Sequence, residues 1–210
     1  VGLMSSQDST AITKTVERWR EGGPALFAQE VLGATPTEQQ WQASREIVKT
    51  RRVSIRSGHG TGKSAFMAWC VLWFIACYFP CKIPCTAPTS HQLSDILWAE
   101  IAKWHRRMLD RLPELAAEFE WSSERFYVKD YPNESFAVAR TSRPEKPEAL
   151  QGFHSESILF LIDEASGVPE AVFQVAEGAL STDGAFVVMA ANPTREDGYF
   201  YDSHHKMRSR

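Results

Sequence analysis

The chain has 210 residues, a length that suits one large α/β domain or one domain with a small appendage. Its 43% hydrophobic and 11% aromatic residues are typical of a globular protein and exclude a disordered one. The formal net charge is −3, from 23 basic and 26 acidic residues. Bulk charge therefore gives no sign of nucleic-acid binding, and any such surface must be a local patch.

The N-terminal segments predict helices. Residues 11–32 read as a helix that is interrupted at Gly22–Pro24. We expect residues 1–34 to form a small helical subdomain that packs on the core or acts as a lid. Thr37 is typical of an N-cap, and the helix that it opens should run to about Thr50.

The most specific motif follows residues 51–56, a short segment that suits a buried strand. Residues 57–64 read Ser-Gly-His-Gly-Thr-Gly-Lys-Ser, and glycines at alternate positions let the backbone turn tightly and point N–H groups at an anion. Lys63 and Ser64 open a helical run whose N-terminal dipole also favours phosphate. Strand, glycine loop and helix together predict a phosphate-binding loop, although Ser57 stands where a glycine is expected. Nucleotide contacts are assigned to the whole loop: Ser57, Gly58, His59, Gly60, Thr61, Gly62, Lys63 and Ser64.

The apolar run that follows, Ala65–Phe79, has 15 residues, short of the ~20 that span a bilayer. It predicts a buried helix and no membrane contact. The four cysteines lie in or just after it, at positions 70, 77, 81 and 85. Buried, reduced thiols are the favoured interpretation, and a zinc site from Cys77, Cys81 and Cys85 is the alternative.

The remaining segments alternate between strand and helix patterns. Strands are predicted at residues 82–87, 125–129, 135–139, 157–162 and 185–190, and helices at 90–109 and 169–180. This alternation predicts an α/β fold with a mostly parallel sheet that helices cover on both faces. We assign residues 35–210 to this core.

Two adjacent carboxylates, Asp163 and Glu164, follow the all-apolar strand and so lie at its carboxyl end, where ligands bind in open α/β sheets. Asp163 is predicted to hold Mg²⁺ together with the Ser64 hydroxyl. Glu164 is predicted to orient and deprotonate the water that attacks the γ-phosphate. The alternative is a solvated strand end.

Two polar side chains are weaker candidates. A glutamine amide can read an adenine edge, which favours ATP at Gln40, unless that residue is merely solvated. Asn192, after the next strand, is predicted to contact the γ-phosphate or the attacking water, unless it only ends a turn. We interpret His59 as incidental or as a weak phosphate contact.

Positive charge near the site has several possible sources. An arginine that offsets γ-phosphate charge could come from a neighbouring subunit or from this chain, where the candidates are Arg56, Arg140, Arg143 and Arg195. Residues 151–154, a glycine loop ahead of the carboxylate strand, could contact nucleotide or DNA. Basic clusters at 49–52, 103–107 and 204–210 are either solvated faces or contacts to DNA phosphates, which are independent of sequence.

Six strings, in this order, resemble one family, the large terminase subunit of tailed bacteriophages and prophages: Pro36–Gln40, Ser57–Ser64, Thr86–Thr89, Ala149–Gly152, Leu161–Ala165 and Asn192–Thr194. The resemblance implies a RecA-like ATPase domain that uses ATP and Mg²⁺ to translocate double-stranded DNA into a procapsid. It also implies a ring of identical subunits, a small terminase subunit and a portal as partners, and the bacterial host cytoplasm.

Residue by residue, the resemblance assigns adenine contact to Gln40, phosphate binding to Lys63 and magnesium binding to Ser64 and Asp163. It assigns catalysis to Glu164 and coupling to Asn192. His59 stands where the family often has an arginine. Family members continue into a nuclease domain of ribonuclease H type, and because this chain stops at Arg210 we expect a truncated ATPase domain without nuclease activity. The alternatives are a superfamily-two helicase lobe and a prophage-remnant nucleotide-binding module without significant turnover.

Overall fold

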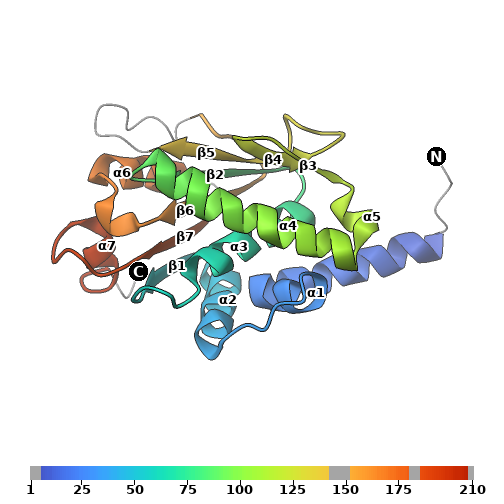
Figure 1. Cartoon of the computed structure of the whole chain (residues 1–210), viewed down its shortest axis with the longest axis horizontal. Coiled ribbons are helices and arrows are strands. Elements are labelled where there is room, and N and C mark those ends of the chain that lie inside the picture. The colour runs from blue at the N-terminus through green and yellow to red at the C-terminus, as the bar shows by residue number, and fades with distance from the viewer. Residues whose placement is uncertain (1–5, 142–151, 180–184, 208–210) are drawn as a thin grey trace.

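One sheet, parallel over most of its width, organises the protein. The computed structural model describes residues 6–141, 152–179 and 185–207. Within these residues the sheet has seven strands in the order β1-β7-β6-β2-β5-β4-β3 (Figure 1). Neighbours from β1 to β5 in that order run parallel, whereas β4 pairs antiparallel with β5 and with β3. The strands are β1 (Arg52–Arg56), β2 (Cys81–Ala87), β3 (Phe119–Trp121), β4 (Arg125–Val128), β5 (Phe136–Thr141), β6 (Ser157–Asp163) and β7 (Ala185–Ala191).

Helices precede, connect and follow the strands, and the predicted α/β class is confirmed. They are α1 (Ser6–Val31), α2 (Glu38–Thr50), α3 (Lys63–Cys77), the π-helix η1 (Gln92–Trp98), α4 (Ala99–Arg111), α5 (Pro113–Ala116), the 3₁₀-helix η3 (Ala165–Gly167), α6 (Glu170–Ala179) and α7 (Gly198–Ser203). In the part of the chain that the structure describes, no helix is both long and apolar enough to cross a membrane.

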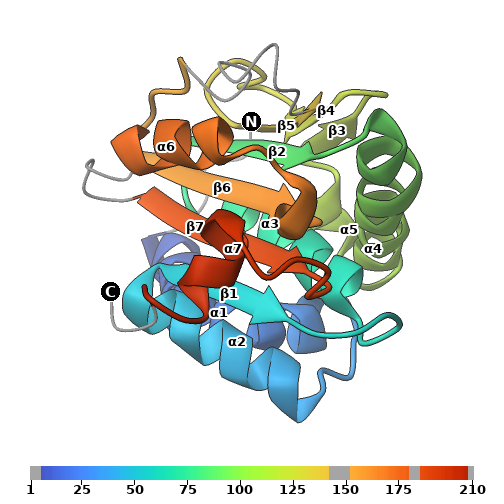
Figure 2. The same cartoon turned by 90° about the vertical axis from the view of Figure 1, so that its left-hand side faces the viewer.

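The two faces of the sheet bury two separate apolar clusters. Along β6, Leu159 and Leu161 join the larger cluster, which includes residues of α1, α3 and α4. Phe160 and Ile162, which point the other way, join the smaller cluster with α6 and Phe200 of α7. Figure 2 shows α6 and α7 in front of β6 and β7, with α3 behind the sheet. The predicted covering of both faces is thus confirmed.

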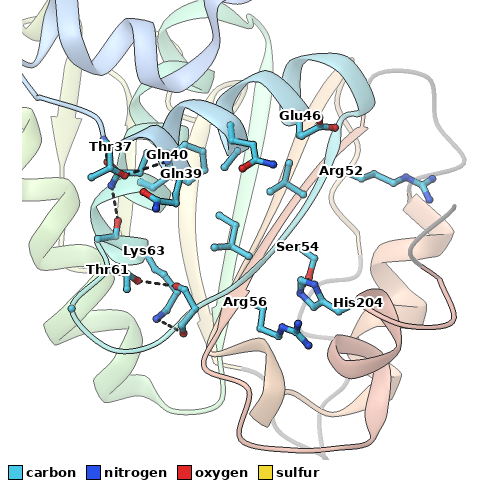
Figure 3. Close-up of a pocket in the computed structure, with 18 residues that line it drawn as sticks. Thr37, Gln39, Gln40, Glu46, Arg52, Ser54, Arg56, Thr61, Lys63 and His204 are labelled. Carbon is cyan, nitrogen blue, oxygen red and sulfur yellow. Dashed lines mark hydrogen bonds between the residues drawn. The ribbon is translucent and has the colours of Figure 1, made fainter.

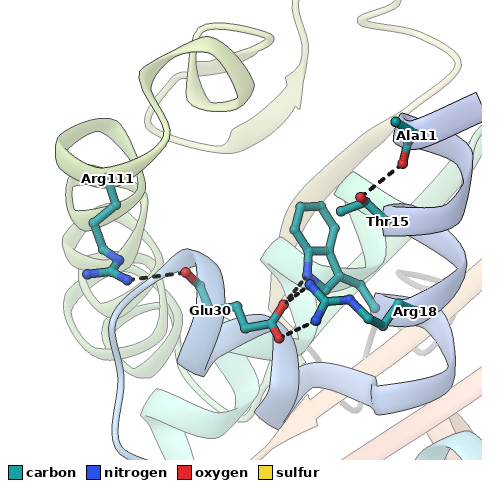
Figure 4. Close-up of polar contacts among 6 residues, drawn as sticks. Ala11, Thr15, Arg18, Glu30 and Arg111 are labelled. Atoms are coloured by element: carbon teal, nitrogen blue, oxygen red, sulfur yellow. Dashed lines mark hydrogen bonds and ion pairs between the residues drawn. The ribbon is translucent and has the colours of Figure 1, made fainter. Parts of the chain in front are cut away.

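Helix α1 bends sharply at Gly23, whose φ of 74° and ψ of −173° lie outside the helical region. A Cβ atom at this glycine would lie 2.6 Å from Ser44 Oγ of α2, so both the backbone angle and the close approach require glycine. Glu30 then ties the two halves together, because its carboxylate accepts hydrogen bonds from Arg18 and from Trp19 Nε1 (Figure 4). Arg111 of α4 donates to the Glu30 carbonyl at 3.3 Å.

The N-terminal helix shares the main core, since Trp19, Phe27 and Val31 belong to the same buried cluster as the sheet. The boundary at residue 34 stays a prediction. The interruption at Gly22–Pro24, the Thr37 cap and the hairpin of β4 and β5 lie where the sequence indicates.

Several elements of the described chain differ from those that the sequence predicts. The helix predicted from residue 90 starts as the π-helix η1, whose wider turn brings Leu93 and Trp98, five positions apart, to its buried side. The short elements β3, α5 and α7 are not predicted by the sequence, because each has too few residues for a clear periodicity. Strand β3 extends the sheet beyond β4, and α7 contributes Phe200 to the smaller cluster.

Candidate functional site

The carboxyl ends of three neighbouring strands meet at one edge of the sheet. In register, Arg56 of β1 lies opposite Ala191 of β7, and Ala190 lies opposite Asp163 of β6. The Ser57 N–H donates to the Ala191 carbonyl at 3.3 Å, which keeps β1 and β7 together where the loop begins. The glycine loop, Asn192 and Glu164 therefore leave the sheet side by side. Their convergence is the geometry that the sequence predicts.

The glycine loop leads directly into α3. Gly62 caps the helix with φ of 83°, and a Cβ there would lie 2.8 Å from Gln40 Nε2. The first hydrogen bond of the helix runs from Phe66 N to Gly62 O at 3.0 Å. No side chain caps this N-terminus, and its first turn holds no acidic residue. The positive end of a 15-residue helix is thus open to an anion.

Ser57, which stands in place of the expected first glycine, closes the loop through its hydroxyl. Its Oγ lies 2.8 Å from Thr61 Oγ1, and Thr61 Oγ1 donates to the Gly58 carbonyl at 3.1 Å. These two contacts fix the loop without the missing glycine. Serine at this position is therefore compatible with a phosphate-binding loop, because its hydroxyl makes a contact within the loop itself.

The Lys63 ammonium group occupies the centre of the loop. Its Nζ donates to the carbonyls of Ser57 at 3.1 Å and Gly58 at 2.6 Å, and to Asn192 Oδ1 at 2.9 Å. An ammonium group has three N–H donors, so these contacts use all of them. The contact with Asn192 joins the loop after β1 to the turn after β7. Three oxygen acceptors thus surround a cation at the point where phosphate oxygens are expected.

Asn192 is 6% exposed and holds both ends of its amide in contacts. While Oδ1 accepts from Lys63, Nδ2 lies 2.8 Å from Nε2 of His59. His59 therefore faces Asn192, in addition to any contact that it makes with phosphate. No pattern in the sequence indicates this pair, since the two residues are 133 positions apart.

Asp163 is a buried carboxyl group, 4% exposed, at the end of β6. Burial raises its pKa from 3.8 to about 6, and the Glu164 carboxylate adds to the rise. The Glu164 N–H, which donates to Asp163 Oδ1 at 2.9 Å, and the nearby Lys63 cation act in the opposite direction. A buried carboxyl group close to a lysine is typical of a functional site.

Glu164 has the left-handed backbone angles φ 46° and ψ 44°. This conformation is uncommon for a residue with a long side chain and costs of order 1 kcal/mol. Its carbonyl accepts from Gly167 N at 2.9 Å, the bond that closes the short helix η3. The chain therefore turns directly after Asp163, at the residue that carries the second carboxylate.

Gln40 has a structural task that the sequence motif did not reveal. Its Oε1 accepts from Thr37 N at 2.9 Å, while Thr37 Oγ1 accepts from Gln40 N at 3.3 Å, which completes a capping box for α2. Its Nε2 donates to Gly62 O at 3.1 Å. Gln40 thus ties α2 to the glycine loop. Adenine contact stays a prediction, and in this structure each end of the amide already holds a hydrogen bond.

A cavity of about 800 Å³ lies between α2, β1 and the glycine loop (Figure 3). Its volume is within the usual range for small-molecule sites. The predicted site residues that line it are Gln40, Ser57, Gly60, Thr61, Gly62 and Lys63. The others, which are not part of its wall, are Gly58, His59, Ser64, Asp163, Glu164 and Asn192. Lys63 therefore stands between the cavity and the carboxylates.

The far wall of the cavity is formed by polar residues that the sequence does not predict as site residues. Glu46 of α2, and Arg52 and Ser54 of β1, line it together with His204, whose Nε2 lies 2.8 Å from Ser54 Oγ. Side chains on a strand alternate in direction, so a cavity on one face of the sheet would contact only every second residue. Every residue from Arg52 to Ser57 lines this cavity, which therefore runs along the edge of β1. A sequence pattern cannot indicate such an edge, because it depends on which strands pair.

The arginine candidates differ in position. Arg56 lines the cavity. Arg140 lies in β5 and donates to the carbonyl of Ala139, and Arg195 is exposed just after the turn at Asn192. Arg143 and Gln151 lie outside the described residues. The choice among the arginines stays open.

The cysteines are buried free thiols. Burial raises the pKa values of Cys77 and Cys81 to about 12. Among the described residues, no group of three or more His, Cys, Asp or Glu residues is placed to hold a metal ion, so the zinc alternative has no support in the structure.

The fold and this edge of the sheet define a RecA-like α/β domain with a glycine loop and a neighbouring acidic strand end. No protein-family model matches the sequence. The chain is 33% identical over 207 residues to "Probable terminase, large subunit" of Enterobacteria phage P7, an alignment that covers 93% of this chain and 41% of that protein. The chain thus spans about two fifths of the length of this relative.

Solved structures show the same fold. A mutant of the large terminase ATPase domain of Thermus phage P74-26 superposes with a TM-score of 0.64 at 20% identity, over 86% of this chain and 74% of that one. The large terminase of another thermophilic bacteriophage, in complex with ADP, gives 0.51 at 17% identity, over 73% of this chain and 37% of that one. The chain is therefore similar in sequence to part of a bacteriophage large terminase subunit, and its fold is that of large terminase ATPase domains.

Proposed function

We propose that this domain hydrolyses ATP and thereby powers the translocation of double-stranded DNA into a viral procapsid. The observation that carries the proposal is the Lys63 ammonium group at the open N-terminus of α3, in contact with Asn192 and close to Asp163. The relation to large terminase subunits supports the same function.

In this proposal, the loop N–H groups and Lys63 bind the β- and γ-phosphates. Lys63 exchanges the carbonyls of Ser57 and Gly58 for phosphate oxygens, which is favourable because a charged acceptor makes a stronger hydrogen bond than a carbonyl. Asn192 keeps the lysine directed at the γ-phosphate. Glu164 orients the attacking water and accepts its proton. The cavity beside α2 receives the nucleoside.

The donor set fits Mg²⁺, since the Asp163 carboxylate and the Ser64 hydroxyl are oxygen ligands of the kind that this ion prefers. The Asp163 carboxyl group is buried with a raised pKa, so a cation that stabilises its charged form has a favourable place there. When bound, the ion would neutralise negative charge on the phosphates.

DNA contact would come from exposed basic residues and would be independent of sequence. On α4, the cationic groups of Lys103 and Arg107 lie over the indole ring of Trp104, at 5.2 and 4.7 Å from the ring centre. Arg106 is exposed beside them. Phosphate contacts of this kind weaken steeply with salt. From the family resemblance, the proposal also includes a homo-oligomeric ring, a small terminase subunit and a portal as partners, and a location in the host cytoplasm.

The proposal is tested by nucleotide binding and turnover in two variants. Glu164→Gln should bind Mg-ATP as the wild type does and lose turnover, because the amide cannot accept a proton. Lys63→Ala should lose nucleotide binding. The control is Glu114→Gln, which changes an exposed glutamate on α5 that does not line the cavity. Unchanged turnover in Glu164→Gln would remove Glu164 from its role, and unchanged affinity in Lys63→Ala would contradict the phosphate-loop assignment.

Two other functions give different results in the same assays. A nucleotide-binding module without significant turnover would bind Mg-ATP in the wild type and in Glu164→Gln, and would hydrolyse it in neither, even as an oligomer on double-stranded DNA. A helicase lobe would be stimulated by single strands in preference to duplex DNA. The packaging function predicts stimulation by duplex DNA, with an effect that falls as salt is raised.

A further inference from the structure

His59 is the loop residue whose placement the proposed function does not explain. In the described residues its imidazole makes no hydrogen bond with Asp163 or Lys63. Its Nε2 lies 2.8 Å from Asn192 Nδ2. Asn192 is nearly buried, while His59 is exposed. The histidine therefore covers the amide of Asn192 from the solvent side.

Donor and acceptor chemistry fixes the direction of this contact. An ammonium group only donates, so the Asn192 atom that faces Lys63 must be the oxygen. The amide nitrogen then faces His59 and donates to it, which requires an unprotonated Nε2 on the ring. His59 thus acts as a hydrogen-bond acceptor. Without it, rotation of the amide would no longer be opposed from this side, and the oxygen could turn away from the lysine.

The shape of the loop does not depend on His59. Ser57 and Thr61 hold the loop closed, Gly62 is tied to Gln40, and Ser57 N is bonded to β7. None of these contacts involves the imidazole. A change at position 59 should therefore act on the orientation of Asn192 and leave the loop and the fold as they are.

We propose that His59 is a positioning residue, which holds the Asn192 amide with its oxygen on Lys63 and so directs Asn192 and the lysine at the γ-phosphate. The proposal rests on the proposed ATPase function, and it adds a role that is specific to this histidine. Because the contact acts through Asn192, its loss should lower kcat more than it raises KM.

Three substitutions test whether His59 acts as a hydrogen-bond acceptor or through another property of its side chain. His59→Gln keeps an acceptor oxygen, His59→Phe keeps a flat ring without one, and His59→Lys offers donors only. We expect His59→Phe and His59→Lys to lower kcat for ATP by about tenfold, the size expected for one lost hydrogen bond, with KM within about twofold. His59→Gln should stay within about twofold of the wild type, and so should the control His205→Phe, which changes an exposed histidine in the turn after α7.

A second measurement tests the contact without turnover. In the nucleotide-free protein, the side-chain amide resonance of Asn192, assigned by its absence in Asn192→Asp, should shift strongly in His59→Phe and little in His59→Gln. Wild-type kcat in His59→Phe, or an unmoved Asn192 resonance, would overturn the proposal. Loss of nucleotide affinity in His59→Gln as well as His59→Phe would also overturn it, since the ring would then be a phosphate ligand.

Failure of the proposed function would look different. If the wild type showed no turnover under any condition, the ATPase assignment would fall, and the Asn192 resonance would still decide whether His59 holds the amide. If Lys63→Ala and Glu164→Gln behaved as proposed while His59→Phe resembled the wild type, the function would stand and the positioning role would be rejected.

Discussion

Asp163 should make the domain less stable than it would be with a neutral side chain at the same place. Burial raises the pKa of this carboxyl group from 3.8 to about 6. At about 1.4 kcal/mol for each pH unit, the difference corresponds to roughly 3 kcal/mol at pH values above 6. Asp163→Asn removes the charge and keeps an oxygen that can accept from Glu164 N. In the absence of Mg²⁺ and nucleotide, the variant should therefore be the more stable protein.

The sign and the pH range follow from the two pKa values. Below about pH 4 the carboxyl group is protonated in both the folded and the unfolded chain, so the substitution changes little. Between pH 4 and 6 the unfolded chain ionises first, and the wild type loses stability as pH rises. We expect the gain in unfolding free energy to be about 1 kcal/mol at pH 4.5 and about 3 kcal/mol at pH 8.

Urea denaturation in the presence of EDTA, at pH 4.5 and at pH 8, measures this gain. The matched control is Asp110→Asn on α4, an exposed aspartate whose substitution should have a small effect that is similar at both pH values. The variant should also lose Mg-ATP turnover, which would mark Asp163 as a residue kept for function at the expense of stability. A gain that does not change with pH, or a less stable variant, would refute the reasoning.

Three further predictions concern the loop, its tether and the core. Gly62→Ala should destabilise the protein by about 1–2 kcal/mol through its left-handed backbone, and by more through contact of the new methyl group with Gln40. Gly60 also has a left-handed backbone but open space around it, so Gly60→Ala should show the backbone effect alone in denaturation. Equal losses of stability in the two variants would contradict the contact with Gln40. Gln40→Ala should cost about 1 kcal/mol by removing the capping box and should weaken nucleotide binding, with the exposed neighbour Gln39→Ala as control in thermal melts. Because burial raises their pKa values, the four cysteines should resist iodoacetamide at pH 8 in the native protein and react only on unfolding. Rapid labelling of the native state would show that α3 and β2, which carry these cysteines, are not packed as described.

The order of elements and the core of the site could be predicted because their signals are local. About ten residues of sequence suffice to recognise the glycine loop, or the apolar run of β6 with the carboxylates that end it. In a parallel α/β sheet the carboxyl ends of such strands lie at one edge. The strand, loop and helix around Lys63 lie where the sequence places them. The Thr37 cap is confirmed for the same reason.

The contacts that could not be predicted join residues far apart in the chain. Asn192 meets His59 across 133 positions, and Gln40 meets Gly62 across 22, so neither pair leaves a periodic or spacing signal. The cavity along β1 depends on β1 being the edge of the sheet, which is decided by strand pairing. The π-helix η1 is not predicted, because the apolar residues at 90–109 also fit an α-helical spacing.

The most direct test of the nucleotide site is a crystal structure with Mg²⁺ and a non-hydrolysable ATP analogue. We expect triphosphate at the N-terminus of α3, with Lys63 Nζ moved from the carbonyls of Ser57 and Gly58 to the β- and γ-phosphates, and with Asp163 and Glu164 on the γ-phosphate side. A nucleotide bound elsewhere, or a lysine that keeps its carbonyl contacts while the triphosphate lies outside the loop, would contradict this site.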